Sequence, residues 1–357
     1  MHRGVWGLVL VLAMAACGTG VREVAIERAP DAPTTTSTTS TTTPTSTTVP
    51  PATAATVVTT TVPPTTAPPT TAPPTASAVV PSAVAAVTVD PGTIAPYRGF
   101  GAWLDRYDWS VQWAGPNGRP VGPEAVDHMA AEGVETIYIQ TSYWEDPVGV
   151  IEPDRLRPII DRAHEHGISV IGWYLPAFVD PAKDLQHVEA MHDFGVDGVA
   201  IDIEGTQVKD VPERSRRLVA FSEELRRRFP GFALGGIVLE PVLIEDLSDT
   251  YWPDFPWTEI ASHYDVWMPM NYWTNRRGEW RSAYRYMATN IDRVRQNLGL
   301  PEALVHPIGG IGDKTTEQDL HEMVRAAGER GSIGGSIYDY ATSRAEFWPI
   351  LRAFKTG

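Results

Sequence analysis

The sequence predicts a (β/α)8 TIM barrel that follows a signal peptide and a long tether. Apolar, strand-like segments alternate with amphipathic, helix-like segments through residues 98–354, and eight such units can be recognised. Eight units in roughly 265 residues match the size of one barrel domain. One strand-like segment, 196–205, also ends in acidic residues. A doubly wound open sheet is the alternative, but its glycine-rich nucleotide fingerprint is missing after the first strand.

The strands are predicted where short apolar runs lie between turn residues, and the helices where apolar residues recur every three or four positions. Most of the helices open with proline or close at glycine or proline. The predicted strands are 98–105, 136–142, 168–174, 196–205, 233–239, 266–273, 304–308 and 332–340. The predicted helices are 123–132, 153–166, 181–194, 212–229, 257–264, 280–298, 316–330 and 344–354.

Residues 1–16 are predicted to be a lipoprotein signal peptide. A short basic start leads into the apolar run 5–13, which is too short to span a membrane. The run Met14-Ala15-Ala16-Cys17 resembles a bacterial lipobox, in which the cysteine is acylated. An ordinary signal peptide cut near Ala16 is the alternative. With Cys17 as the lipid attachment site, the protein is expected at the outer face of the cell membrane.

Residues 17–89 are predicted to be a disordered, Thr/Pro-rich tether. The part from 32 to 89 has no charged residue and is dominated by Thr, Pro, Ala, Val and Ser, so it cannot build a core. A Pro-rich chain extends by about 3.1 Å per residue, which gives the tether a reach on the order of 150 Å. We therefore expect it to project the domain 90–357 into or beyond a cell wall.

The formal net charge of -15 falls almost wholly on the domain after Asp90. Such a surface argues against nucleic acid as a partner and is easier to reconcile with a neutral or cationic ligand. Cys17 is the single cysteine, so no disulfide can form within one chain. No cofactor or metal is predicted, because His164 and His166 lie two positions apart on a helix and face different directions.

The segment 196–205 is the chemically most informative part of the domain. Side chains alternate along a strand, so Ala200, Asp202 and Glu204 share one face while the isoleucines between them share the other. Two carboxyl groups on the inner face of a barrel strand are costly to desolvate, which favours a functional reason for them. Asp197, at the start of the strand, is expected to be structural.

The ends of the other strands are expected to add aromatic and polar side chains to the same mouth. Rings that stack on sugars, set around a carboxyl group that can protonate a glycosidic oxygen, are typical of glycoside hydrolysis. The predicted mouth residues are Trp103, Asp105, Gln140, Ser142, Trp144, Trp173, Tyr174, Glu240, Met270, Asn271, Tyr272, Trp273, His306, Tyr338, Asp339 and Tyr340.

The stretch from Asp197 to Glu204 resembles DGxDxDxE, the strand-four signature of glycoside hydrolase family 18, the chitinase family. The resemblance implies that Glu204 is the general acid and that Asp202 orients the acetamido group of the substrate and tunes that acid. Met270-Asn271-Tyr272 resembles the MxY motif of the family and gives Tyr272 a second contact to the acetamido group. The DIEG run is also similar to the acidic strand of family 25 lysozymes.

The sequence departs from the family 18 pattern at two positions. Ala200 stands where the family has a middle Asp, and Trp273 stands where Asp or Asn follows the Tyr. The expected function is hydrolysis of a β-linked glycan, such as an N-acetylhexosamine-containing wall polymer, with Glu204 as the acid. Because of the two departures, a barrel that binds glycan without cleaving it, as a lectin or scaffold, is the alternative.

Two further mouth residues have open roles. Glu240 is either a base that activates water or a loop residue beside Pro241. His306 is expected to be a wall or core residue rather than a base. A carboxylate at the end of strand seven, which one large clan of retaining barrel hydrolases requires, is missing there.

Overall fold

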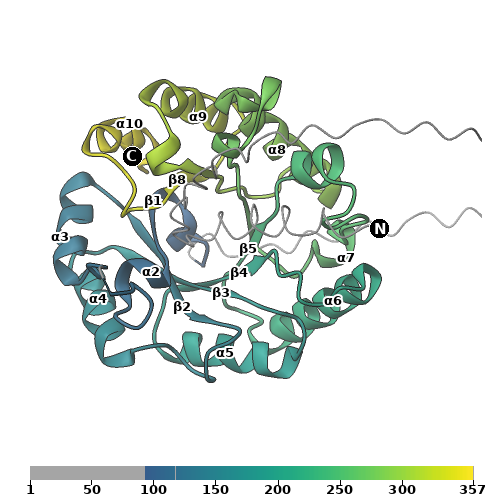
Figure 1. Cartoon of the computed structure of the whole chain (residues 1–357), viewed down its shortest axis with the longest axis horizontal. Coiled ribbons are helices and arrows are strands. Elements are labelled where there is room, and N and C mark those ends of the chain that lie inside the picture. The colour runs from purple at the N-terminus through teal and green to yellow at the C-terminus, as the bar shows by residue number, and fades with distance from the viewer. Residues whose placement is uncertain (1–92, 117, 357) are drawn as a thin grey trace, which may run out of the picture. The chain divides into compact units, whose positions relative to one another are not determined.

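Parallel strands pair side by side in a nearly closed ring in the computed structural model, which describes residues 93–116 and 118–356. The order of the strands is β6-β5-β4-β3-β2-β1-β8-β7. Bridges from Trp267 to Val305 and from Met270 to Ile308 join the two ends of the sheet. Helices surround this ring on its outside (Figure 1). The fold is therefore the predicted (β/α)8 TIM barrel, while the predicted signal peptide, Cys17 and the tether lie outside the described residues.

The strands are short and buried on both faces, as expected for a parallel barrel. They are β1 Gly99–Leu104, β2 Thr136–Tyr143, β3 Ser169–Leu175, β4 Gly198–Ile203, β5 Leu234–Val238, β6 Val266–Pro269, β7 Ile308–Ile311 and β8 Gly334–Tyr338.

The helices follow the strands in alternation. The α-helices are α2 Arg106–Trp109, α3 Pro123–Glu132, α4 Pro153–Glu165, α5 Pro181–Asp193, α6 Val211–Arg228, α7 Trp257–Ile260, α8 Ala283–Leu298, α9 Glu317–Glu329 and α10 Trp348–Leu351. Short helical turns are η1 Ala95–Tyr97, η2 Leu243–Leu247, η3 Trp273–Asn275, η4 Gly278–Arg281, η5 Gly312–Lys314, η6 Ala345–Phe347 and η7 Arg352–Phe354. Among the described residues, no helix combines the length and the apolar character needed to cross a membrane.

The predicted bounds of strand seven, 304–308, are wrong. The strand runs from Ile308 to Ile311, so His306 precedes it and lies inside the barrel instead of at the mouth. Its Nδ1 is 2.8 Å from the carbonyl oxygen of Tyr97, and its Nε2 is 3.0 Å from Oγ of Ser336. Burial lowers the pKa of His306 to about 4, so the ring is neutral. The expectation that His306 is a core residue is confirmed.

Two predicted helices are shorter than expected for identifiable reasons. The segment 344–354 is divided into η6, α10 and η7, with Pro349 near the start of α10, where it cannot donate a backbone hydrogen bond. Helix α7 ends at Ile260. Arg226 of α6 donates two hydrogen bonds to the carbonyl oxygen of His263. That oxygen therefore belongs to a contact between α6 and the segment after α7.

The N-terminal end of the barrel is filled by the ring of Tyr97. Its hydroxyl lies 2.7 Å from the carbonyl oxygen of Val199 and 3.0 Å from that of Ala233. A Cβ atom added to Gly198 or Gly235 would lie 2.9 Å from this tyrosine, so both positions have to be glycine. The ring therefore ties η1, which precedes β1, to β4 and to the residue before β5 at the end opposite to the mouth.

Asp197 has the structural role expected of it. Its Oδ2 accepts a hydrogen bond from the backbone N–H of Val170 at 2.7 Å and lies 2.9 Å from Nε2 of His164. These contacts link the start of β4 to β3 and α4. His166 instead contacts Asp127, so the two histidines do not converge.

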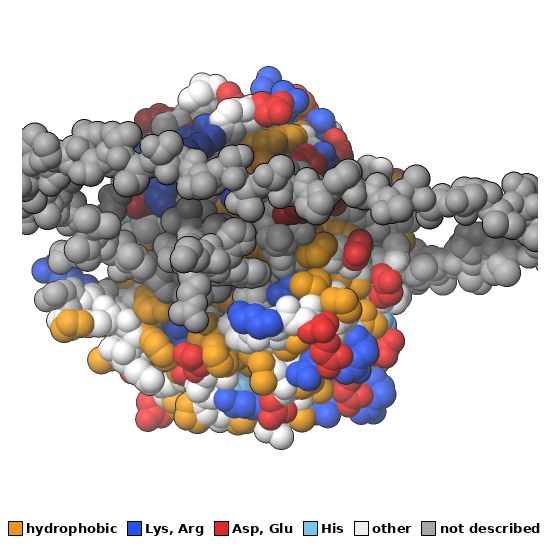
Figure 2. Space-filling model, turned by 45° about the vertical axis from the view of Figure 1, so that its right-hand side comes forward, with side chains coloured by type: hydrophobic (Ala, Val, Ile, Leu, Met, Phe, Trp, Pro, Cys, Tyr) orange, Lys and Arg blue, Asp and Glu red, His pale blue; other side chains and the backbone are white. Residues whose placement is uncertain are grey.

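Charged side chains of both signs are intermixed on the face of the molecule seen in Figure 2. Helix α6 follows the same pattern, since Glu213 pairs with Arg216 and Arg217, and Glu224 pairs with Arg227. Opposite charges at such short range screen each other, so these ion pairs contribute little to the field at long range.

Candidate active site

Strand β4 brings two carboxyl groups to its C-terminal end. Asp202 is 3% exposed, and Glu204, which follows the strand directly, is 6% exposed. Ala200 lies two residues earlier on the same face, next in register to Trp173 of β3. Asp202 is next in register to Ile237 of β5. The two carboxyl groups therefore border an apolar layer of the barrel interior.

Burial changes the protonation of this carboxyl pair. It raises the pKa of Asp202 well above its ordinary value, and the neighbouring Glu204 raises that pKa further. Among the described residues, Oδ1 of Asp202 has no hydrogen-bond partner. A charged carboxylate is costly in such surroundings, and a protonated carboxyl is much less so. We therefore expect the two groups to share a proton and to titrate as a pair.

A buried carboxylate fixes the segment that carries Tyr272. Oε1 of Glu240 accepts a hydrogen bond from the backbone N–H of Tyr272 at 3.1 Å and from Nη2 of Arg276 at 3.0 Å. Nε of Arg276 donates to the hydroxyl of Tyr286 on α8 at 2.7 Å. Burial by itself lowers the pKa of Arg276, but the neighbouring Glu240 and Tyr286 raise it above its ordinary value. This geometry favours the alternative in which Glu240 is a structural loop residue, because its oxygen is engaged by a permanent cation.

Aromatic rings from β1, β2 and β3 pack together inside the barrel. Trp103 stacks on Tyr138 with 4.5 Å between ring centroids, and it meets Trp173 edge-on at 5.9 Å. Trp103 is further fixed because its Nε1 donates to Oγ of Ser336 at 2.8 Å. The Trp103 and Trp173 rings are buried, so they form a rigid part of the interior beside Ala200.

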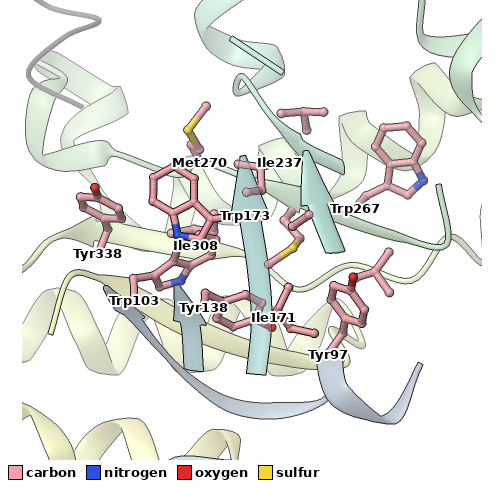
Figure 3. Close-up of a cluster of buried hydrophobic side chains, with 14 of the residues drawn as sticks. Tyr97, Trp103, Tyr138, Ile171, Trp173, Ile237, Trp267, Met270, Ile308 and Tyr338 are labelled. Atoms are coloured by element: carbon pink, nitrogen blue, oxygen red, sulfur yellow. The ribbon is translucent and has the colours of Figure 1, made fainter. Parts of the chain in front are cut away.

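Tyr338, at the end of β8, continues this aromatic group. Its ring centroid lies 6.2 Å from that of Trp103 and 6.0 Å from that of Tyr272. Figure 3 shows Tyr338, Trp103, Trp173 and Met270 at the same end of the cluster. The structure thus brings rings from β1, β3 and β8 together with Met270, the residue that follows β6.

Asp105 does not stand free at the mouth, because its carboxylate caps helix α2. Oδ1 accepts hydrogen bonds from the backbone N–H groups of Tyr107 and Asp108, and Oδ2 accepts one from the hydroxyl of Tyr338 at 2.8 Å. Burial, followed by the charge of Asp339, raises the pKa of Asp105 to about 7. Asp105 was predicted at the mouth, but its hydrogen bonds to α2 and Tyr338 were not predicted.

Two of the predicted mouth residues turn away from the barrel interior. The hydroxyl of Tyr174 donates to Asp184 of α5 at 2.6 Å, and its ring stacks on His187 of the same helix. Tyr340 packs against Trp348, and its hydroxyl lies 3.3 Å from Nδ1 of His128. Tyr174 therefore faces α5, and Tyr340 contacts α3 and α10, so their assignment to the substrate site gains no support from these contacts. Residues of a twisted strand end alternate in direction, and Tyr174 falls on the outward side.

The remaining predicted residues support the site or border it. Oε1 of Gln140 accepts a hydrogen bond from the backbone N–H of Arg106 and so holds helix α2. The amide of Asn271 donates to the carbonyl oxygen of Pro269. Trp273 is fully buried beside Gly310, where an added Cβ would come within 3.0 Å of its ring. Trp144 and Ser142 lie at the end of the β2 segment, Trp144 half-buried and Ser142 buried.

Arg276 and Asp108 are the important residues that sequence reasoning missed. The spacing of Asp105 and Asp108 is that of a capping box, and this signal was available in the sequence. Arg276 gave no such signal, because its partner Glu240 is 36 residues away in the chain.

One group of carboxyl groups has a spacing that a cation could use. Carboxyl oxygens of Asp105, Asp108 and Asp339 all lie within 4.8 Å of one another. Hard cations prefer oxygen ligands of this kind, although buried acids can also be neutralised by protons. No other observation on the described residues favours a cation here, and the absence of a metal stays a prediction.

Solved structures with this fold include glycoside hydrolases. The spore cortex-lytic enzyme SleL of Bacillus cereus is 10% identical, with a TM-score of 0.53 over 72% of this chain and 74% of that chain. A chitinase of Chromobacterium violaceum is 11% identical, with a TM-score of 0.50 over 72% and 100%. A GH18 chitinase of Cycas revoluta in complex with (GlcNAc)4 is 11% identical, with a TM-score of 0.52 over 71% and 98%.

No protein-family model matches the chain, and no curated protein matches it by sequence. The resemblance to the GH18 chitinases is therefore established at the level of the fold. It confirms the predicted (β/α)8 barrel, and the family suggested by the motifs on β4 and after β6 stays a prediction.

Replacing Glu240 by Gln tests its structural role. The change leaves the Arg276 guanidinium buried without its counter-ion, and we expect a loss of about 3 kcal/mol of unfolding free energy. The double variant Glu240→Gln with Arg276→Met should recover a large part of that loss, because no unpaired charge remains. Urea unfolding of the two single variants and the double variant measures this coupling. Additive losses would show that the pair does not act as an anchor.

Proposed function

We propose that the chain is a cell-surface glycoside hydrolase that cleaves a β-linked glycan containing N-acetylhexosamine. The observation that carries the proposal is the buried pair of Asp202 and Glu204 at the end of β4. A carboxyl group kept protonated by its surroundings can give its proton to a glycosidic oxygen as the bond breaks. In this scheme Glu204 is the general acid, Asp202 shares its proton before the bond breaks, and the water that completes the hydrolysis returns a proton to the pair.

At the ends of β5 and β7, no acid among the described residues is placed to serve as the second carboxylate of a conventional retaining mechanism. Strand β7 is rich in glycine and carries no acid, and Glu240 is bound to Arg276. Asp202 and Glu204 are two residues apart on one strand, with Cβ atoms about 6.5 Å apart, so both lie on the same side of a bound sugar. Cleavage assisted by the acetamido group of the substrate fits this arrangement best, with Tyr272 and Asp202 holding that group.

The fold and the aromatic interior support a carbohydrate ligand. The Cycas revoluta structure holds a tetramer of N-acetylglucosamine, and the Bacillus cereus enzyme is named for lysis of spore cortex. In this chain Trp103, Trp173 and Tyr338 pack on one another, and Trp173 is next in register to Ala200, two residues before Asp202. Rings of this size can stack on the apolar faces of sugars, which supports a carbohydrate ligand at this end of the barrel.

The proposal places the barrel outside the cell. The lipobox-like run ending at Cys17 supports a lipid anchor, and the uncharged segment 32–89 supports a spacer between that anchor and the domain. A glycan-cleaving domain held in this way acts on polymers within reach of its own cell surface.

Glu204→Gln should lower the rate of glycan cleavage at least about a hundredfold, because the amide cannot deliver the proton in the transition state. Glu165→Gln, the same change on the exposed side of α4, is the matched control and should leave the rate unchanged. The assay is release of reducing ends from chitin oligomers and peptidoglycan by the full chain.

A second function follows if cleavage is absent. Ala200 and Trp273, which depart from the family 18 pattern, favour a lectin or scaffold that binds glycan without cleaving it. In that case the wild-type protein and Glu204→Gln bind the same glycans with similar affinity, and neither releases reducing ends. That result would replace the hydrolase with the binding function.

Cys17→Ser should move the protein from the membrane fraction to the medium, or leave it unprocessed, because the acyl chain has no attachment point. Cell fractionation followed by mass measurement of the mature N-terminus checks this. Thr19→Ser, a mild change two residues after the cysteine, is the control and should leave the protein with the membrane. A processed Cys17→Ser protein that stays with the membrane contradicts the anchor.

A further inference from the structure

We propose that Asp105 is a positioning residue that holds the ring of Tyr338 in place as a wall of the sugar pocket. The inference rests on the proposed function, because it assigns Tyr338 to the pocket of a carbohydrate-active barrel. Asp105 does not touch the substrate and acts through Tyr338.

The contact between the two residues joins neighbouring strands. Asp105 follows β1 directly and Tyr338 ends β8, and these strands are paired in the sheet. The Tyr338 hydroxyl donates to Oδ2 of Asp105 at 2.8 Å, while Oδ1 accepts from the backbone N–H of Tyr107 at 2.7 Å. Both oxygens are therefore engaged, and the carboxyl group cannot rotate without breaking the start of α2. This fixes the hydroxyl end of the Tyr338 ring.

The faces and edges of the Tyr338 ring are held by other aromatic residues. Its ring meets that of Tyr272 at 64° with 6.0 Å between centroids, and that of Trp103 at 45° with 6.2 Å. Glu240 in turn fixes the backbone of Tyr272. Tyr338 thus connects the acetamido-binding residue of the proposed mechanism to helix α2, and Asp105 is the polar end of that connection.

Charged groups around Asp105 make the contact sensitive to pH. The carboxyl groups of Asp108 on α2 and Asp339 after β8 face it directly, and Asp313 of η5 faces Asp339. The guanidinium of Arg106 is instead held between the rings of Trp113 and Tyr143, 3.8 Å and 3.7 Å from their centroids. The acidic groups therefore act on Asp105 without a close basic partner among these contacts.

The direction of the pH effect follows from these neighbours. Burial, with Asp339 next, raises the pKa of Asp105 to about 7, above the ordinary value of 3.8. The folded state therefore holds this proton more tightly than the unfolded state does. The resulting stability is present at acidic pH and is lost as the pH rises from 3.8 to about 7. Above that range, the charge on Asp105 repels Asp339 and loosens the end of β8.

Hydrogen exchange of the backbone amides of residues 336–343 tests the proposal in the full chain. After correction for intrinsic rates, wild-type protection should fall about tenfold from pH 6 to pH 8, the effect of one pKa unit. Asp105→Asn should show a clearly smaller pH dependence, because its amide stays neutral and only Asp108 and Asp339 still titrate there. Asp161→Asn on α4 is the matched control, since that exposed acid pairs with Arg157, and it should behave as wild type.

Binding of (GlcNAc)4 gives the functional readout. Asp105→Ala and Tyr338→Phe should each weaken binding roughly tenfold, about the value of one hydrogen bond to a carboxyl group. The double variant should be no worse than either single variant, because the two changes remove the same contact. Independent, multiplying losses would overturn the positioning role.

The exchange measurement decides the position of Tyr338 whether or not the tetramer binds. Failure of the wild-type protein to bind or cleave any glycan counts against the proposed function alone. Equal pH dependence of protection in wild type and Asp105→Asn overturns the inference. It is also overturned if millimolar Ca²⁺ restores protection at pH 8, because a cation and not a proton would then hold the three acids together.

Discussion

The structure depends on keeping two adjacent carboxyl groups inside an apolar barrel. Asp202 and Glu204 are buried at the end of β4, and the layer beside them consists of Ala200, Trp173 and Ile237. Desolvating two neighbouring charged carboxylates would cost several kcal/mol, which is comparable to the stability of a whole domain. A shared proton removes most of that cost. The same proton is what a general acid requires, so the constraint on stability and the proposed chemistry have one origin.

The other buried acids at this end of the barrel are compensated differently. Glu240 is neutralised by Arg276, and Asp105 accepts hydrogen bonds from two backbone amides and a tyrosine. In the part of the chain that the structure describes, the carboxyl oxygen that is buried without a hydrogen-bond partner belongs to Asp202. The anchored acids hold Tyr272 and Tyr338 in place, whereas Oδ1 of Asp202 is buried without such a partner. In a preorganised active site, fixed side chains surround the group that reacts.

Much of the fold could be predicted from the sequence because each unit carries its own signals. Proline at the start of α4 and glycine after α3 bound those helices where they were expected, and the alternation on β4 placed Asp202 and Glu204 on one inner face. Strand β7 was predicted too early in the chain because the segment from Leu304 to Ile308 is as apolar as the strand itself. Tyr174 was misplaced because one position along a strand reverses the direction of a side chain, and Tyr340 because it lies beyond the end of β8, where that alternation no longer applies.

The support around the site could not be predicted in the same way. The pairing of Glu240 with Arg276 and of Asp105 with Tyr338 joins residues 36 and 233 positions apart in the chain. No local pattern encodes such contacts, since they arise when the barrel closes and brings β1 beside β8. Periodicity therefore identifies the strand that carries the chemistry, and tertiary closure decides which neighbouring acids are anchors.

Carboxyl ¹³C titration by NMR tests the shared proton at Asp202 and Glu204 most directly. The account predicts that the Asp202 carboxyl titrates well above its ordinary value in the wild-type protein. Its pKa should fall in Glu204→Gln, because the neighbouring carboxylate no longer disfavours its ionisation. An Asp202 carboxyl that titrates near 3.8 in both proteins would contradict the account, since burial and Glu204 would then not disfavour its charge and the two groups would not share a proton.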